Sequence, residues 1–288
     1  MAAQQQSLSR DELGDTLSTY RHLRLAMALL LGLLLTAVFL RAFTAPGICF
    51  EGSISAYYYT SARAVFVGAL CALGTCLIVY RGNTDAEDVT LNASGALAFV
   101  VAFVPTGAPM GGKRCSASNV PSPEELQAAT NNNMAAFMLL GLLALVVAIA
   151  LVVRSTRLGN GPKVALFVFG LVLAAGILAF VLWPAGFREH AHLVAAVGTF
   201  FGILGVVGLN AWGAQPGRYR TIYGVIAGLM ALTAAGIWLA IAVTDEWDHA
   251  VFVVELLMLV LFLAFWVAQT LELWRRTSRH APALAPPP

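Results

Sequence analysis

The sequence has very little charge for its length. Only 11% of its 288 residues are Asp, Glu, Lys or Arg, whereas 59% are hydrophobic and the mean hydropathy is +0.78. Soluble domains carry about 25% charged residues. So few charges cannot cover a surface that faces water, which excludes a soluble globular protein. The composition therefore predicts an integral membrane protein.

Signatures of common enzyme classes are also missing. There is no HExxH, HxxxH, GxSxG or CxxC motif, so nothing indicates the usual zinc, serine-hydrolase or dithiol chemistry. GAPMGGK at 107–113 does not have the spacing of a P-loop. Basic segments such as RSTRLGNGPK fit a membrane topology. The sequence therefore predicts no cofactor and no nucleic-acid partner.

Long apolar runs dominate what is present. A membrane-spanning helix needs about 20 mainly apolar residues. Eight segments qualify as spans, the third being short: 23–43, 61–80, 90–106, 134–153, 163–183, 190–212, 221–243 and 250–274. We therefore predict an all-α, polytopic transmembrane bundle of about eight spans. This domain, residues 23–274, follows a polar arm at 1–22 and precedes a Pro-rich tail at 275–288. We expect the arm and the last residues of the tail to be mobile, although the arm could also form a short amphipathic helix.

Basic residues predict the orientation of the chain. With eight spans both termini lie on one side of the membrane, and cytoplasmic loops carry the excess of Lys and Arg. The side with the termini would hold Arg10, Arg21, Arg24, Arg81, Arg154, Arg157, Lys163, Arg218, Arg220, Arg275, Arg276 and Arg279. The opposite side would hold Arg41, Arg63, Lys113, Arg114 and Arg188. We therefore expect a multi-pass protein of the cell (inner or plasma) membrane with both termini cytoplasmic.

Two outer loops and one inner loop carry local signals. SPEELQAAT at 122–130 has a capping-box pattern and predicts a short helix on the outer surface. Acidic residues at 85–88 fit the start of the third span; the alternative is a functional acidic patch. Cys49 and Cys115 fall in the two outer loops, where they could form a disulfide or stay as separate thiols.

A cluster of polar residues is predicted near the outer surface. Ionisable groups inside spans are expensive to bury and indicate function. Arg63 begins the second span, His192 lies near the outer start of the sixth, and Glu255 lies about five residues into the eighth. An Arg63–Glu255 ion pair would offset the cost of burial, and His192 could join it. Glu51, Ser53, Ser55 and the three tyrosines Tyr57 to Tyr59 would cover this cluster, and of the tyrosines Tyr58 is predicted to bind the ligand.

Three stretches carry a resemblance to known proteins. They are SISAYYYTSARAVFVGALCALGTCLIVYRG with the following AED, LNASGALA and FVPTG; HLVAAVGTFF; and GRYRTIYGVIAG with FVVELLMLVLFLAFWV. Together they resemble a pattern in bacterial multi-pass membrane proteins of uncharacterised function, and the first is distantly similar to the Frag/DRAM/Sfk group. The resemblance implies a membrane bundle and no reaction. Its recurring polar positions match Ser53, Ser55, Arg63, Glu87, Asn92, His192 and Glu255.

Three functions remain open from the sequence. The first is a non-enzymatic membrane protein whose outer pocket binds a lipid headgroup or small ligand, as a sensor, lipid-organising protein or accessory subunit of a membrane partner. The same cluster could be only a structural clasp, or its residues could fail to meet. The second function is a transporter. The third is an outward-facing metal hydrolase that would use the outer acids and imidazoles, although His190 and His192 would face apart on a helix. These candidate ligands are His190, His192, Asp245, Asp248 and His249.

Overall fold

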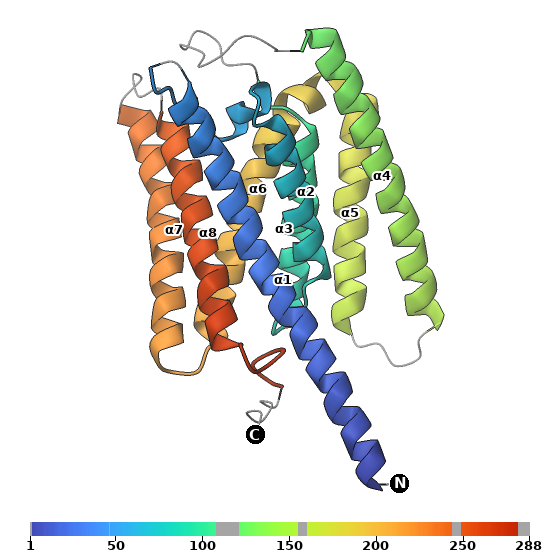
Figure 1. Ribbon diagram of the computed structural model, residues 1–288. Coiled ribbons are helices and arrows are strands. Elements are labelled where there is room, and N and C mark those ends of the chain that lie inside the picture. Colours follow the sequence, from blue (N-terminus) through green and yellow to red (C-terminus); the bar gives the residue numbers. More distant parts are fainter. Residues whose placement is uncertain (1, 46, 108–120, 155–159, 244–248, 282–288) are drawn as a thin grey trace.

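The computed structural model describes residues 2–45, 47–107, 121–154, 160–243 and 249–281, and these residues form helices and no strand (Figure 1). The helices are α1 (Ala2–Thr44), the 3-10 helix η1 (Ser55–Tyr59), α2 (Arg63–Val79), α3 (Asp85–Phe103), α4 (Pro123–Arg154), α5 (Asn160–Leu182), α6 (Pro184–Gly213), α7 (Arg218–Val243) and α8 (Ala250–Glu272). Six segments of the described helices are long and apolar enough to cross a membrane. The all-helical membrane bundle is confirmed, while eight spans stays a prediction.

Six helices form a closed ring. Around it, α1 packs on α2, α2 on α3, α3 on α6, α6 on α7, α7 on α8, and α8 returns to α1. The α4–α5 hairpin lies outside this ring beside α3 and α6 (Figure 1). The helix α1 begins, and α8 ends, at the same end of the bundle, which we call the terminal end; η1 lies at the opposite, η1 end. One apolar core runs through the ring.

Capping residues fix the starts of two helices. The backbone N–H of Glu125 donates to Ser122 Oγ at 3.2 Å, and the backbone N–H of Ser122 donates to Glu125 Oε2 at 2.8 Å. This reciprocal pair is the predicted capping box. The helix that it starts is not a separate surface helix, however, because it continues directly into the apolar part of α4. At α3, Thr84 Oγ1 accepts from the backbone N–H of Glu87 at 3.2 Å.

The predicted polar arm is part of the first helix. The helix α1 runs without a break from Ala2 to Thr44, and its first turns project beyond the terminal end of the ring (Figure 1). Its 43 residues correspond to a length of about 65 Å. Only part of it is needed to cross a bilayer core of about 30 Å. Within the described part, Leu17 is already buried, so packing begins before the predicted span does.

Glycines let α3 approach its two neighbours in the ring. A Cβ on Gly74 of α2 would lie 2.7 Å from the carbonyl oxygen of Gly95, and a Cβ on Gly95 would lie 2.6 Å from that of Gly74. On the other side, a Cβ on Gly202 of α6 would lie 2.1 Å from Ser94 Oγ. The helix α6 therefore packs closely on α3 at Gly202, whereas nothing lies within 4 Å of Gly208.

The α2–α3 contact predicts that Gly74→Ala destabilises the protein. The added methyl group would collide with backbone, which cannot rotate away. We expect a loss of about 1–3 kcal/mol in the free energy of unfolding, measured by thermal unfolding in detergent. Gly68→Ala, on the same helix with nothing within 4 Å, is the control and should leave stability unchanged or slightly raised. Equal melting temperatures for the two variants would contradict the close contact.

Candidate functional site

Glu255 joins α8 to the loop at the η1 end. Its Oε2 accepts hydrogen bonds from the backbone N–H groups of Ile54 at 2.5 Å and Ser55 at 3.4 Å, and its Oε1 accepts from Ser55 Oγ at 3.0 Å. The carboxylate therefore holds the first residues of η1 against the side of α8.

Backbone contacts secure the same loop around this carboxylate. The backbone N–H of Phe252 donates to the carbonyl oxygen of Gly52 at 3.0 Å, and His249 Nε2 lies 3.2 Å from that of Phe50. Ser53 Oγ accepts from the backbone N–H of Ala56 at 3.0 Å and so supports the start of η1. Tyr57 of η1 is fully buried, and this burial raises the pKa of its phenol. The loop is thus a packed cap over one end of the ring.

Arg63 does not join Glu255. Its Nε donates to the carbonyl oxygen of Tyr58 at 2.6 Å, and its guanidinium lies 4.8 Å from the centre of the Tyr58 ring. No ion pair among the described residues includes Glu255. The Arg63–Glu255 pair considered from the sequence is therefore not formed, because the arginine finds a carbonyl and an aromatic face on its own side of η1.

His192 also lies apart from Glu255. Its Nδ1 is 2.6 Å from the carbonyl oxygen of Val104, at the end of α3, while its buried Nε2 has no hydrogen-bond partner in the described structure. Glu51 is buried in the loop before η1. The predicted ligand-binding residues were Glu51, Ser53, Ser55, Tyr58, Arg63, His192 and Glu255. Among them, the described hydrogen bonds join Ser55 to Glu255 and Arg63 to Tyr58. Ser53 and His192 bond to Ala56 and Val104 instead.

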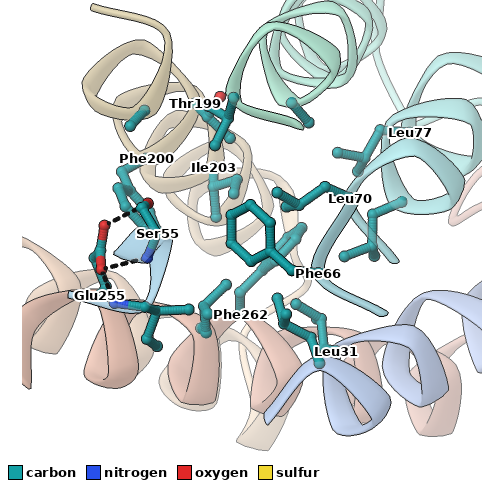
Figure 2. Close-up of a pocket in the computed structure, with 17 residues that line it drawn as sticks. Leu31, Ser55, Phe66, Leu70, Leu77, Thr199, Phe200, Ile203, Glu255 and Phe262 are labelled. Carbon is teal, nitrogen blue, oxygen red and sulfur yellow. Dashed lines mark hydrogen bonds between the residues drawn. The ribbon is translucent and has the colours of Figure 1, made fainter. Parts of the chain in front are cut away.

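An apolar cavity of about 60 Å³ extends from Glu255 into the centre of the ring (Figure 2). Its walls come from α1, α2, α3, α6 and α8 and include Leu31, Phe66, Leu70, Ile203 and Phe262. Ser55 and Glu255 lie together at one side of it, with their hydrogen bonds intact (Figure 2). The cavity therefore combines a hydrocarbon interior with one acidic group.

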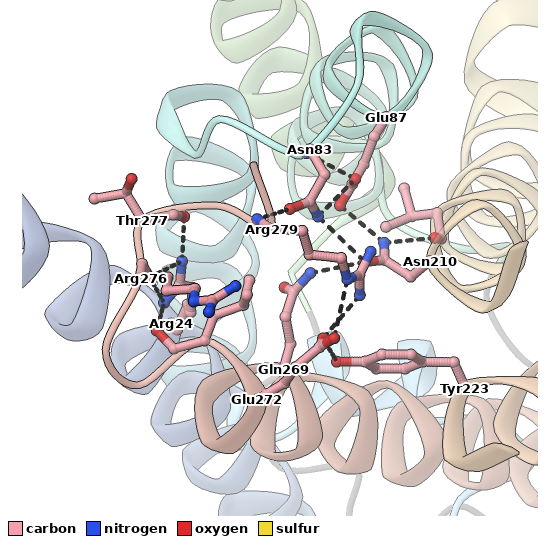
Figure 3. A network of polar contacts seen from close by, with 12 residues as sticks. Arg24, Asn83, Glu87, Asn210, Tyr223, Gln269, Glu272, Arg276, Thr277 and Arg279 are labelled. Atoms are coloured by element: carbon pink, nitrogen blue, oxygen red, sulfur yellow. Dashed lines mark hydrogen bonds and ion pairs between the residues drawn. The ribbon is translucent and has the colours of Figure 1, made fainter. Parts of the chain in front are cut away.

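A second polar centre lies toward the terminal end (Figure 3), and sequence reasoning assigned it to no site. Asn210, which is fully buried, donates through Nδ2 to Glu87 Oε1 at 2.8 Å. Its Oδ1 accepts from Gln269 Nε2 at 3.0 Å and from Asn83 Nδ2 at 3.4 Å. Glu87 Oε2 accepts in turn from Asn83. We call Asn83, Glu87, Asn210 and Gln269 the polar layer.

An ion pair borders the polar layer. Arg279 donates from Nε and Nη2 to Glu272 at 3.0 and 2.8 Å, and the Tyr223 hydroxyl donates to Glu272 Oε2 at 2.7 Å. Burial alone would lower the pKa of Arg279, but its hydrogen bonds to Glu272 and the attraction of that charge outweigh burial and raise it. Arg279 therefore stays charged beside the buried layer.

The polar layer and the cavity lie one after the other along the axis of the helix ring. On three helices a buried polar residue stands seven positions from a cavity-lining residue, which is two helical turns on the same face and about 10 Å along the axis. The pairs are Arg24 with Leu31 on α1, Ile203 with Asn210 on α6, and Phe262 with Gln269 on α8. Asn210 and Gln269 belong to the polar layer, so on α6 and α8 the layer lies two helical turns from the cavity.

Two predictions extend beyond the described residues. Among the described residues, no three His, Cys, Asp or Glu side chains are grouped so that they could hold a metal ion. Asp245 and Asp248 lie outside the described residues. Cys115 does too, so its pairing with Cys49 stays a prediction; Cys71 and Cys76 are free thiols in α2.

The chain has no significant match to a protein-family model, a curated protein or a solved structure. Its resemblance to the Frag/DRAM/Sfk group therefore stays a prediction, and the function has to be argued from the geometry of the molecule itself.

The polar layer predicts a large effect of Asn210→Ala on stability. The substitution removes the hydrogen-bond partner of Glu87 Oε1 and of Gln269 Nε2, while Glu87 Oε2 keeps its bonds to Asn83. Each orphaned buried polar atom costs about 1–3 kcal/mol. Unfolding in detergent should show the loss. Asn92→Ala, which removes an exposed amide from α3, should have little effect. If both substitutions destabilise the protein equally, the layer does not hold the ring together.

Proposed function

We propose that this protein is a non-enzymatic integral membrane protein that binds an amphipathic molecule in the centre of its helix ring. The cavity carries the proposal, because its walls are almost wholly apolar and it ends at one carboxylate. Sites for small molecules are typically apolar with a few placed polar groups. The distribution of basic residues supports a location in the cell membrane with cytoplasmic termini. Membrane lipid is then the most abundant ligand of suitable chemistry.

The size of the cavity favours a slender ligand. Sites for drug-sized molecules enclose about 300–1,000 Å³, whereas this cavity encloses about 60 Å³. A bulky or polar substrate would have to displace packed side chains such as Phe66 and Phe262. A short length of hydrocarbon chain needs no polar partner and would pack against the same leucine and phenylalanine side chains.

The acidic end of the cavity favours a ligand whose head group carries a positive charge or donates hydrogen bonds. Glu255 lines the cavity, and its described partners are neutral donors rather than cations. A buried carboxylate is strongly stabilised by an opposite charge. An amine head beside Glu255, with its chain directed toward Phe262, would meet both requirements.

Transport is the second candidate. It is favoured by the alignment of the polar layer with the cavity, which places polar groups at two levels along the helix ring. It requires the ring to open at both ends. A metal hydrolase has no supporting observation among the described residues.

A binding measurement with two single-chain amphiphiles tests the proposal. Native mass spectrometry of the protein in detergent would compare oleylamine, which has a cationic head, with oleic acid. We expect the wild-type protein to prefer the amine. Glu255→Gln should lower amine binding by about tenfold or more while leaving oleic acid binding largely unchanged, because hydrogen bonds to charged groups are the strong ones.

A cavity-filling variant supplies an independent test. Ala196→Leu places a larger side chain into the cavity wall and should reduce binding of both amphiphiles. Ala144→Leu on the exposed face of α4 makes the same chemical change and should leave binding as in the wild type. Unchanged binding in Ala196→Leu would contradict the proposed site. If Glu255→Gln lowers the melting temperature without changing the preference for the amine, Glu255 is only a structural clasp.

A further inference from the structure

The residues after α8 fold back across the terminal end of the ring. We call residues 273–281 the strap. Its backbone meets α1 through Arg24, whose side chain is fully buried. Arg24 Nη1 donates to the carbonyl oxygens of Leu273 at 2.9 Å and Arg276 at 3.3 Å, and Nη2 donates to that of Thr277 at 2.5 Å (Figure 3). One guanidinium therefore binds three strap carbonyls.

Arg24 depends on the strap for most of its partners. Besides the strap carbonyls it donates from Nε to the Tyr80 hydroxyl at 3.0 Å, and its guanidinium lies 5.6 Å from the ring centres of Tyr20 and Tyr80. None of its described partners is a carboxylate. A buried charge is costly unless its hydrogen bonds are satisfied. The closed strap thus solvates a cation that the ring itself does not neutralise.

A second anchor ties the strap to the polar layer. The backbone N–H of Arg279 donates to Asn83 Oδ1 at 2.9 Å, while the Arg279 side chain forms its ion pair with Glu272. Asn83 is bonded to both Glu87 and Asn210. The strap therefore lies directly over the polar layer and covers the axis of the ring at this end.

Polar contacts rather than apolar packing hold the strap. Leu273, at its junction with α8, is buried, but residues 274–276 are exposed and residues 277–279 are only partly buried. Segments with little buried apolar surface open at a lower free energy than packed helices. Packing therefore holds the strap less firmly than it holds α8 or α1.

We propose that the strap is a latch that closes the terminal end of the helix ring and that its release opens the axis at the polar layer. The latch has two buried or part-buried locks, the Arg24 guanidinium with its carbonyls and the Arg279–Glu272 pair with Asn83. An exposed hydrogen bond from Arg21 Nε to the carbonyl oxygen of Trp274, at 2.5 Å, adds a third contact to α1. The proposal does not depend on which molecule enters the cavity, since it concerns access to the axis alone.

Thiol accessibility on the axis tests the latch. Val207 is fully buried on α6, between cavity-lining Ile203 and Asn210, so Val207→Cys places a small reporter above the polar layer. Labelling by a water-soluble thiol reagent in detergent would be quantified at that peptide by mass spectrometry. Adding Arg24→Gln should speed labelling by about tenfold or more, because several charged hydrogen bonds hold the closed state.

Arg276→Gln is the matched control. It removes the same charge from the strap, but Arg276 takes part in the latch through its backbone carbonyl and its side chain is exposed. Labelling in this variant should match that of the reporter protein alone. Two further variants should also speed labelling: Arg279→Gln, which breaks the second lock, and a chain that ends at Leu273. They test the latch if Arg24→Gln fails to fold.

The latch would be overturned if the control, Arg279→Gln and the shortened chain were all labelled at the same rate. A rate that rises only together with a lost melting transition would do the same, because it would show that the strap stabilises the fold and does not gate it. Amphiphile binding by the unmodified protein is unaffected by either result, so failure of the latch and failure of the proposed function are distinguishable.

Discussion

A buried carboxylate that must find donors organises one end of this molecule. Glu255 stands on an otherwise apolar stretch of α8, and an unsatisfied charge at that depth would be expensive. The backbone of Ile54 and Ser55 meets this need and in doing so fixes η1 across the end of the ring. The cavity exists beneath this cap because the carboxylate is held to one side, leaving the centre to leucine and phenylalanine side chains.

The same constraint acts at the other end with different chemistry. There Arg24 is satisfied by strap carbonyls, and Glu87 by amides from two other segments. A ring of six helices thus carries polar closures at both ends and an apolar interior between them. The α4–α5 hairpin takes no part in lining the cavity, so the apolar character of those two helices does not bear on the chemistry of the cavity.

The sequence predicted the helices better than the contacts between side chains of different helices. Apolar length located the helices, and the capping box located the start of α4 because both signals are local. Glu255 and Ser55 were both predicted as site residues. Arg63 was predicted to pair with Glu255 because the two were placed at a similar depth in the membrane. It instead bonds to the carbonyl oxygen of Tyr58 and packs on the Tyr58 ring. The polar layer was missed because its members come from the α2–α3 loop and from three helices, and which of these segments are neighbours depends on packing that no single segment encodes.

An experimental density map of the protein in lipid nanodiscs tests the central claim most directly, namely that polar closures at both ends enclose an apolar binding cavity. The account predicts elongated non-protein density between Glu255 and Phe262, inside a ring in which α1 contacts both α2 and α8. A map in which side chains fill that space, or in which Glu255 turns away from the loop before η1 toward lipid, would contradict it.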